Sequence, residues 1–200
     1  WQIKAEEANP LPNLAKDWEF SSDRKSLTMY LLEGARWSDG DIFDTEDIDF
    51  WWNDNVQDAN VNSRLPKDAL GAGTTLEILG PYSFKFNFDE PKGNAVLAQL
   101  AYMGGAPGPS HVMKPLHPAH NSDATYESYA NGMPASVLPI VTMGAFVPVV
   151  HKVDELMVMK RNPYYWKVDE ECNQLPYYNE TIYKLTSWDD RTTQALAGTG

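Results

Sequence analysis

The stretch from Gly34 to Trp52 joins a tight turn to the start of a helix, and it constrains the fold more than any other part of the chain. The Ser-Asp-Gly run at residues 38–40 can reverse the chain, because short polar side chains bond to nearby backbone groups and glycine accepts a positive φ. Asp44 or Thr45 can then cap a helix. Apolar residues follow at helical spacing, namely Ile48, Trp51, Trp52 and Val56. A strand that enters this turn is therefore predicted to continue into a helix.

The same stretch is acidic, so it must be weighed as a calcium site. Asp39, Asp41, Asp44 and Glu46 supply carboxylate oxygens within a short span. An EF-hand loop, however, requires glycine at its sixth position and glutamate at its twelfth. Counted from Asp39, these positions hold Asp44 and Phe50. We therefore expect helix capping and solvated surface here, and no metal.

Two β-hairpins are predicted in the first half of the chain from the alternation of apolar and polar residues. The first joins Trp18–Phe20 to Ser26–Glu33, and the second joins residues 74–79 to residues 83–88 across a Gly-Pro-Tyr turn. Three aromatic residues of the last strand share one face: Phe84, Phe86 and Phe88. Such a stripe can stack on bases or sugars, but a strand that faces the core is the commoner origin, so we expect core.

Short helices and loops are predicted in the middle of the chain. Asn94 can cap a helix that ends near Ala101, a loop rich in glycine and proline follows, and Asp123 can cap a helix to about Asn131.

Three histidines between these helices, His111, His117 and His120, could in principle converge on zinc. Structural zinc sites favour four ligands in tight pairs, and Pro115 and Pro118 are expected to hold this segment extended. We therefore expect no metal site.

Beyond residue 140 the alternation of apolar and polar residues again predicts strands. Residues 145–151 and 156–161 form a predicted hairpin that breaks at Asn162 and Pro163. The final Ala-Leu-Ala-Gly-Thr-Gly run is interpreted as part of a helix that is still continuing at Gly200. Together the patterns predict an α+β fold with a mixed sheet, hairpins and short helices.

The amino-acid composition excludes some classes of function for this chain. Hydrophobic residues make up 42% of the 200 residues and aromatic residues 12%, enough for one core or one larger unit with a subdomain. The formal net charge of −12 excludes a nucleic-acid partner, because phosphate binding needs clustered lysine and arginine. Cys172 is the single cysteine and cannot form an intramolecular disulfide. No apolar run approaches the roughly 20 residues that span a bilayer, so we expect a soluble excised piece whose signal sequence lies outside these residues.

Blocks near the start, middle and end of the chain resemble, in the correct order, the family 5 extracytoplasmic solute-binding proteins of ABC importers, which include oligopeptide, dipeptide and nickel binders. The first block, P-N-L-A-K-D-W, contains Trp18. The second, W-S-D-G-D-I-F-D-T-E-D-I, supplies Trp37, Asp39, Gly40, Phe43, Glu46 and Asp47. The third, R-N-P-Y-Y-W, supplies Arg161, Asn162, Pro163, Tyr165 and Trp166. We assign these motif residues a structural role.

The resemblance implies a two-lobed clamshell of the type II periplasmic-binding-protein fold, with ligand held between the lobes. Residues 1–200 would form part of the first lobe, with about 20–140 as a subdomain, 141–200 as the return to the main lobe and the approach to the hinge, and the second lobe absent. Five residues are expected to contact ligand: Met143, Gly144, Phe146, Trp188 and Asp189. We expect a monomer that works with ABC permease subunits and needs no cofactor. It would lie outside the cytoplasm, in the periplasm or anchored on the outer face of the membrane.

The ligand class is open between two alternatives. Oligopeptide is the first choice, because peptides are captured largely through backbone bonding, which leaves little trace in a sequence. Oligosaccharide is the alternative, because tryptophan rings stack on pyranose faces, although Trp37 and Trp166 belong to family motifs and are predicted to be core. A fragment of a secreted carbohydrate-active hydrolase is the rival class. No pair of carboxylates sits in a motif that predicts the required separation of about 5 to 10 Å, so we expect no enzyme.

Overall fold

The computed structural model describes residues 10–63, 65, 67–102, 107–129 and 137–198. The chain divides into two compact units. Residues 1–35 and 41–132 belong to the first, and residues 36–40 and 133–200 to the second. The turn predicted at residues 38–40 is thus assigned to the second unit together with Arg36 and Trp37, although residues 1–35 and 41–132 belong to the first.

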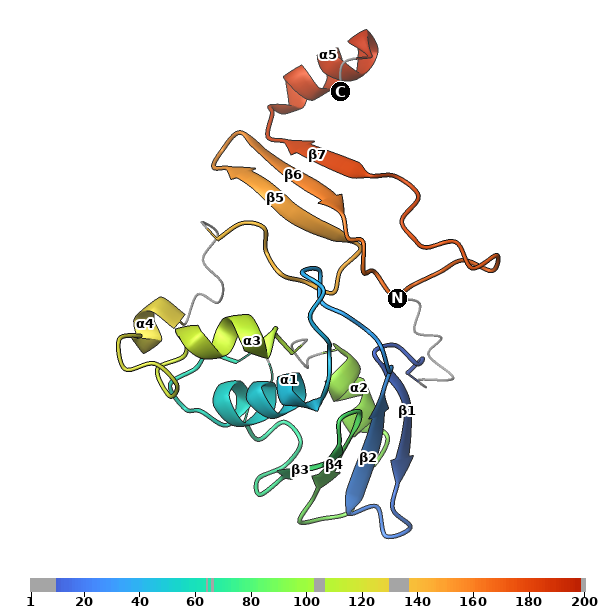
Figure 1. The fold of residues 1–200 in the computed structure, drawn as a ribbon, viewed down its shortest axis with the longest axis vertical. Helices are drawn as coiled ribbons and strands as arrows, with labels where there is room; N and C mark the ends of the chain where they lie inside the picture. The colour runs from blue at the N-terminus through green and yellow to red at the C-terminus, as the bar shows by residue number, and fades with distance from the viewer. Residues whose placement is uncertain (1–9, 64, 66, 103–106, 130–136, 199–200) are drawn as a thin grey trace. The chain divides into compact units, whose positions relative to one another are not determined.

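The first unit is built on an antiparallel sheet of four strands in the order β1-β2-β4-β3 (Figure 1). The strands are β1 (Ala15–Phe20), β2 (Ser26–Leu31), β3 (Thr75–Gly80) and β4 (Ser83–Asn87). Leu27 of β2 lies opposite Phe86 of β4, and Met29 lies opposite Phe84. All four side chains are buried, because the period of two places them on one face. The prediction that the phenylalanine stripe faces the core is confirmed.

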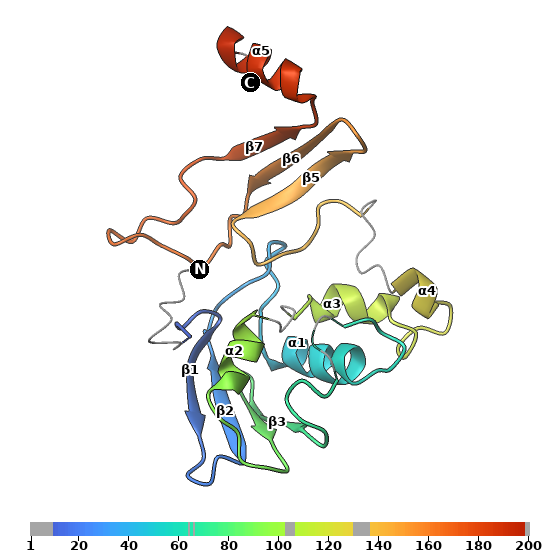
Figure 2. The same cartoon turned by 180° about the vertical axis from the view of Figure 1, so that it is seen from behind.

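Short helices accompany this sheet (Figure 2). They are α1 (Thr45–Asp49), the π-helix η1 (Phe50–Val56), α2 (Ala95–Tyr102), α3 (Ser110–Met113), the 3-10 helix η2 (Lys114–Leu116) and α4 (Tyr126–Tyr129). Asp44 caps α1 by accepting a hydrogen bond from the Glu46 N–H at 2.7 Å. Trp52 packs against Phe86 with ring centroids 5.0 Å apart, which joins η1 to the sheet.

The predicted helix over Ile48–Val56 is present, but from Phe50 to Val56 it is a π-helix, since the Gln57 N–H bonds to the Trp52 carbonyl five residues earlier. Two other local predictions in this unit are wrong. The segment around Pro115 is helical and not extended, because proline is tolerated in a first helical turn, where its missing N–H would have no partner. The helix predicted from Asp123 begins at Tyr126, after Thr125, whose hydroxyl accepts from the Ser128 N–H. The glycine-rich run at residues 103–106 lies outside the described residues.

The second unit contains an antiparallel sheet of three strands in the order β5-β6-β7 and one helix. The elements are β5 (Phe146–Lys152), β6 (Leu156–Arg161), β7 (Glu180–Lys184) and α5 (Trp188–Ala197). The predicted hairpin of β5 and β6 is confirmed. The helix predicted to continue to Gly200 instead ends at Ala197, because Gly198 adopts a left-handed conformation with φ of 65°. Within the described part of the chain, no helix is long and apolar enough to cross a membrane.

Candidate ligand-binding site

The segment that carries Met143, Gly144 and Phe146 is held by the turn at residues 36–40. The Ser38 N–H donates to the Thr142 carbonyl at 3.0 Å, and the Thr142 N–H donates to the Ser38 hydroxyl at 3.1 Å. The Thr142 hydroxyl then accepts from the Gly144 N–H at 3.0 Å. Three hydrogen bonds therefore fix the backbone just before β5.

Asn162 holds the same segment from the other side. Its side-chain amide donates to the Gly144 carbonyl and its backbone N–H donates to the Ala145 carbonyl, both at 2.9 Å. Its side-chain oxygen accepts from the Tyr164 N–H, also at 2.9 Å. The residue is fully buried, so these bonds have little competition from water. Asn162 thus links the R-N-P-Y-Y-W motif to the predicted ligand segment.

The Trp-Ser-Asp-Gly turn packs against the same motif. Trp37 is buried, as predicted, and Gly40 has a φ of +96°, also as predicted. A Cβ added at Gly40 would lie 3.1 Å from the ring of Tyr164, so the turn approaches that ring closely. The two family motifs, far apart in the sequence, are in contact within the second unit.

Two neighbouring tyrosines were not predicted as ligand residues, and one of them, Tyr178, contacts this segment. Phe146 and Tyr178 stack with ring centroids 4.9 Å apart and an angle of 29° between the planes. The Tyr177 hydroxyl donates to Asp169 Oδ2 at 2.6 Å. This bond, with others from the backbone and side chain of Asn173, lowers the pKa of Asp169 to about 2. Tyr178 and Tyr177 nevertheless remain 58% and 69% exposed.

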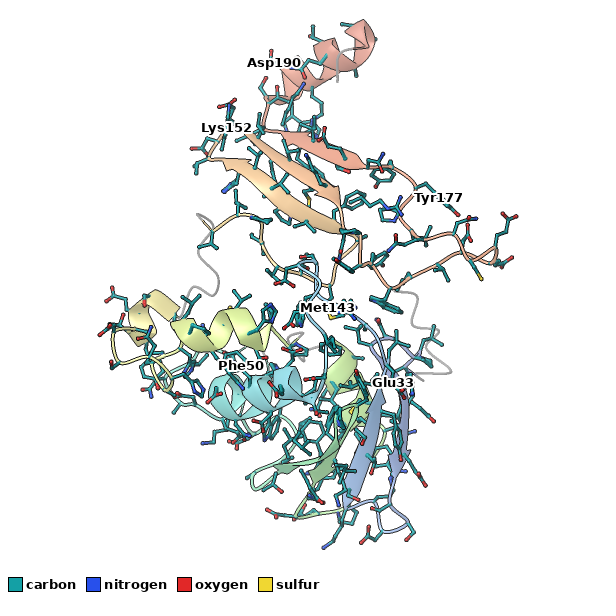
Figure 3. All side chains as sticks on the ribbon, in the orientation of Figure 1. Glu33, Phe50, Met143, Lys152, Tyr177 and Asp190 are labelled. Atoms are coloured by element: carbon teal, nitrogen blue, oxygen red, sulfur yellow. The ribbon has the colours of Figure 1, made fainter. Side chains whose placement is uncertain are left out.

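Trp188 and Asp189 lie apart from the other predicted ligand residues. Met143 is near one end of the β5–β6–β7 sheet, and the α5 residue Asp190 lies beyond the other end (Figure 3). Trp188 is 78% exposed at the start of α5, and the guanidinium of Arg191 lies 4.5 Å from the centroid of its ring. The structure therefore brings three of the five predicted residues together along the chain and places the other two elsewhere in the same unit.

Four of the remaining motif residues lie in the first unit. Phe43 and Asp47 are buried, Trp18 is half-buried and Glu46 is exposed. Asp47 Oδ1 accepts from the Ser110 N–H at 2.8 Å, which joins α1 to the start of α3. This contact agrees with the structural role predicted for Asp47.

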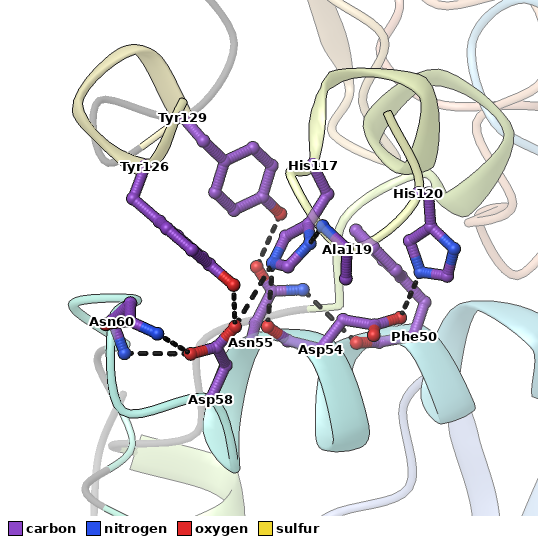
Figure 4. Close-up of polar contacts among 10 residues, drawn as sticks. All are labelled: Phe50, Asp54, Asn55, Asp58, Asn60, His117, Ala119, His120, Tyr126 and Tyr129. Carbon is purple, nitrogen blue, oxygen red and sulfur yellow. Dashed lines mark hydrogen bonds and ion pairs between the residues drawn. The ribbon is translucent and has the colours of Figure 1, made fainter. Parts of the chain in front are cut away.

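A polar cluster joins η1 to the segment that follows η2 (Figure 4). His117 is fully buried, its Nδ1 accepts from the Ala119 N–H at 3.1 Å, and its Nε2 lies 3.0 Å from the Asp54 carbonyl. Because a carbonyl can only accept, Nε2 is the donor in this contact. The Tyr126 hydroxyl donates to Asp58 Oδ2 at 2.7 Å.

Electrostatics in the cluster agree with a structural role. Desolvation alone would raise the pKa of Asp58, but hydrogen bonds from Tyr126 and Asn60 outweigh it and lower that pKa. Burial raises the pKa of Tyr129 to about 12. No group of three or more histidine, cysteine or acidic side chains among the described residues is arranged to hold a metal ion. The cluster is a satisfied hydrogen-bond network that fixes helices to one another.

The first unit also contains an apolar cavity of about 270 Å³ beside β2, β4 and α2. Trp18, Trp51 and Phe84 contribute aromatic walls, and Asn13 is the polar amide on its lining. A solute with many hydroxyl groups needs many hydrogen-bond partners, so this cavity is poorly suited to a sugar.

Comparison with known proteins defines the class to which this fold and these motifs belong. A periplasmic α-galactoside-binding protein of Rhizobium meliloti (strain 1021) is 48% identical over 203 residues, which cover 100% of this chain and 29% of that protein. The solved periplasmic binding protein MelB of Agrobacterium fabrum C58, in complex with stachyose, superposes with a TM-score of 0.88 at 46% identity, over 100% of this chain and 30% of that chain.

A more distant relative binds a different solute. The periplasmic oligopeptide-binding protein OppA of Salmonella typhimurium (strain LT2) is 26% identical over 188 residues, covering 86% of this chain and 32% of that protein. The chain thus spans about 30% of the length of the relatives it matches. All three are binding proteins and not enzymes, in agreement with the prediction of no catalytic function.

The class is that of solute-binding proteins of ABC importers. Residues 9–200 match the family of bacterial extracellular solute-binding proteins, family 5, and the chain belongs to that family. The predicted family and the predicted α+β fold are both confirmed. The assignment of residues 20–140 and 141–200 to subdomain and main lobe stays a prediction.

Proposed function

We propose that this chain is part of an oligosaccharide-binding protein that captures α-galactosides outside the cytoplasm and delivers them to an ABC permease. One observation carries the proposal: identity to an α-galactoside-binding protein is 48% over the whole chain, whereas identity to OppA is 26% over 86% of it. The sequence analysis preferred oligopeptide and kept oligosaccharide as the alternative. The identities favour the oligosaccharide alternative. Oligopeptide remains the second candidate, on the strength of the OppA likeness.

The mechanism follows from the clamshell architecture of the family. A solute that bridges two lobes stabilises the closed state, because only that state offers contacts on both of its faces. The permease would then distinguish the loaded protein from the empty one by its shape. The protein would act as a monomer in the periplasm, or anchored on the outer face of the membrane.

We place the contribution of this chain to the solute site at Met143, Gly144 and Phe146, with Trp188 and Asp189 as further candidates. The support is geometric. Hydrogen bonds from Ser38 and Asn162 fix the segment that carries Met143, Gly144 and Phe146. Its conformational entropy is therefore already lost on folding, and no further loss opposes binding.

Isothermal titration calorimetry of the full-length protein tests the function. We expect stachyose to bind with a Kd at or below the micromolar range, and lactose, a β-galactoside, to bind at least tenfold more weakly. A panel of tri- to pentapeptides is the matched test of the second candidate. Tight binding of peptides without binding of stachyose would overturn the proposal.

A further inference from the structure

We propose that Tyr178, supported from behind by Phe146, is a stacking platform for one pyranose ring of the solute. This assignment rests on the proposed oligosaccharide function and extends the site beyond the residues that the sequence predicts.

The first step of the argument is the geometry of the two rings. Their centroids are 4.9 Å apart and their planes differ by 29°, so Phe146 covers one face of the tyrosine ring. Tyr178 is still 58% exposed, so the face that Phe146 does not cover is the one available to a solute. A flat apolar surface that is open on one side fits the C–H face of a pyranose, whose hydroxyl groups project mainly from the ring edge.

The second step is that the platform is fixed before any solute binds. Phe146 begins β5 and follows the segment that Ser38 and Asn162 hold in place. The Arg161 N–H donates to the Asn179 carbonyl at 2.8 Å, which ties the residue after Tyr178 to β6. An exposed side chain normally loses rotamer freedom on binding, but here that loss has already occurred.

The third step is the polar surroundings, which a sugar site needs besides a flat ring. Tyr177 is held by its hydrogen bond to Asp169, and that carboxylate also accepts from Asn173. Tyr177 is 69% exposed and directly precedes Tyr178 in the sequence. Asn179, on the other side, is also exposed. The hydroxyl groups at the edge of the sugar ring could therefore form hydrogen bonds with the amide of Asn179 and the phenol of Tyr177.

Galactose fits such a surface well. Its axial 4-hydroxyl lies on one face of the ring and leaves several C–H groups together on the other. We therefore expect a galactosyl unit of the α-galactoside on Tyr178.

The test compares four variants of the full-length protein by calorimetry with stachyose. Tyr178→Ala removes the ring and is expected to raise the Kd about 10- to 100-fold, the range typical of a buried aromatic contact. Tyr178→Phe keeps the ring and should stay within about twofold of the wild type, since the face and not the hydroxyl makes the contact. Phe146→Leu removes the support, and its Kd should fall between these two.

Tyr183→Ala is the matched control, because Tyr183 is also 58% exposed and lies in the same unit on β7. Its Kd should equal that of the wild type. Melting temperatures of all variants are measured alongside. If Tyr178→Ala does not fold, Tyr178→Leu keeps apolar bulk without a flat ring and is expected to show the same loss of affinity.

The outcomes separate the two proposals. If the wild type binds stachyose and Tyr178→Ala binds it equally well, the platform is wrong and the oligosaccharide function stands. An equal loss in Tyr183→Ala would also overturn the platform, because the effect would not be local. If the wild type binds no α-galactoside, the proposed function fails and the platform with it.

Discussion

At the scale of single residues, Asn162 is the buried polar residue that holds the segment before β5. It is fully buried, and its side chain donates to Gly144 and accepts from Tyr164. Replacing Asn162 with Ala leaves both backbone groups without this partner. We expect a loss of about 2–4 kcal/mol in the free energy of unfolding, measured by urea denaturation. Asn53→Ala removes an exposed helical contact to Asp49 and should cost less than about 0.5 kcal/mol. Equal losses would contradict the role given to burial.

Asp169 gives a prediction on pH. Its pKa in the folded protein is about 2, below the ordinary value of 3.8, because Tyr177 and then Asn173 donate hydrogen bonds to the ionised carboxylate. A lowered folded pKa means that the stabilisation is present above pH 3.8 and is lost as the pH falls through 2. Carbon NMR of the Asp169 carboxyl should give this midpoint, and Tyr177→Phe should raise it. Tyr178→Phe is the control and should leave it unchanged.

At the scale of elements, the turn at residues 36–40 has little room for an added side chain at Gly40. Gly40→Ala places an L-residue at a φ of +96° and its Cβ 3.1 Å from Tyr164. Gly34→Ala is the matched control for Gly40→Ala. Its φ is also positive, at +79°, but nothing lies within 4 Å of the added Cβ.

We expect Gly34→Ala to destabilise by about 1–2 kcal/mol from backbone strain alone, and Gly40→Ala to destabilise by more. Thermal unfolding of both variants measures the difference. If Gly40→Ala were the milder of the two, the close approach of this turn to Tyr164 would be excluded.

At the scale of the whole molecule, the relatives are about three times as long as this chain, which covers 29–30% of them. A clamshell buries its solute between two lobes, and one lobe leaves a face of the solute in water. If the full-length protein binds stachyose near 1 μM, which corresponds to about −8.2 kcal/mol, retention of half of that free energy places residues 1–200 near the millimolar range. Calorimetry on both proteins tests this expectation. Micromolar binding by residues 1–200 alone would show that the site lies within this part.

Much of the local structure could be predicted from the sequence, because its causes are local. Asp44 caps α1 through an amide two residues away, and Phe84 and Phe86 share a face because of the strand period. The positive φ at Gly40 follows from turn chemistry over four residues. The fold class could also be predicted from the sequence, because the family motifs occur along the chain in the order typical of the family.

The arrangement of the candidate site was decided only by the tertiary structure. Ser38 and Thr142 bond across 104 residues, and no local pattern in either segment indicates the other as its partner. The same holds for Phe146 and Tyr178, whose stacking depends on how β6 and β7 bring the loop before β7 beside the start of β5. Side-chain propensity and periodicity report on a few residues of chain at a time, whereas these contacts depend on packing between distant segments. The sequence therefore determined most of the elements and the family, and the tertiary structure determined which side chains lie together in the candidate site.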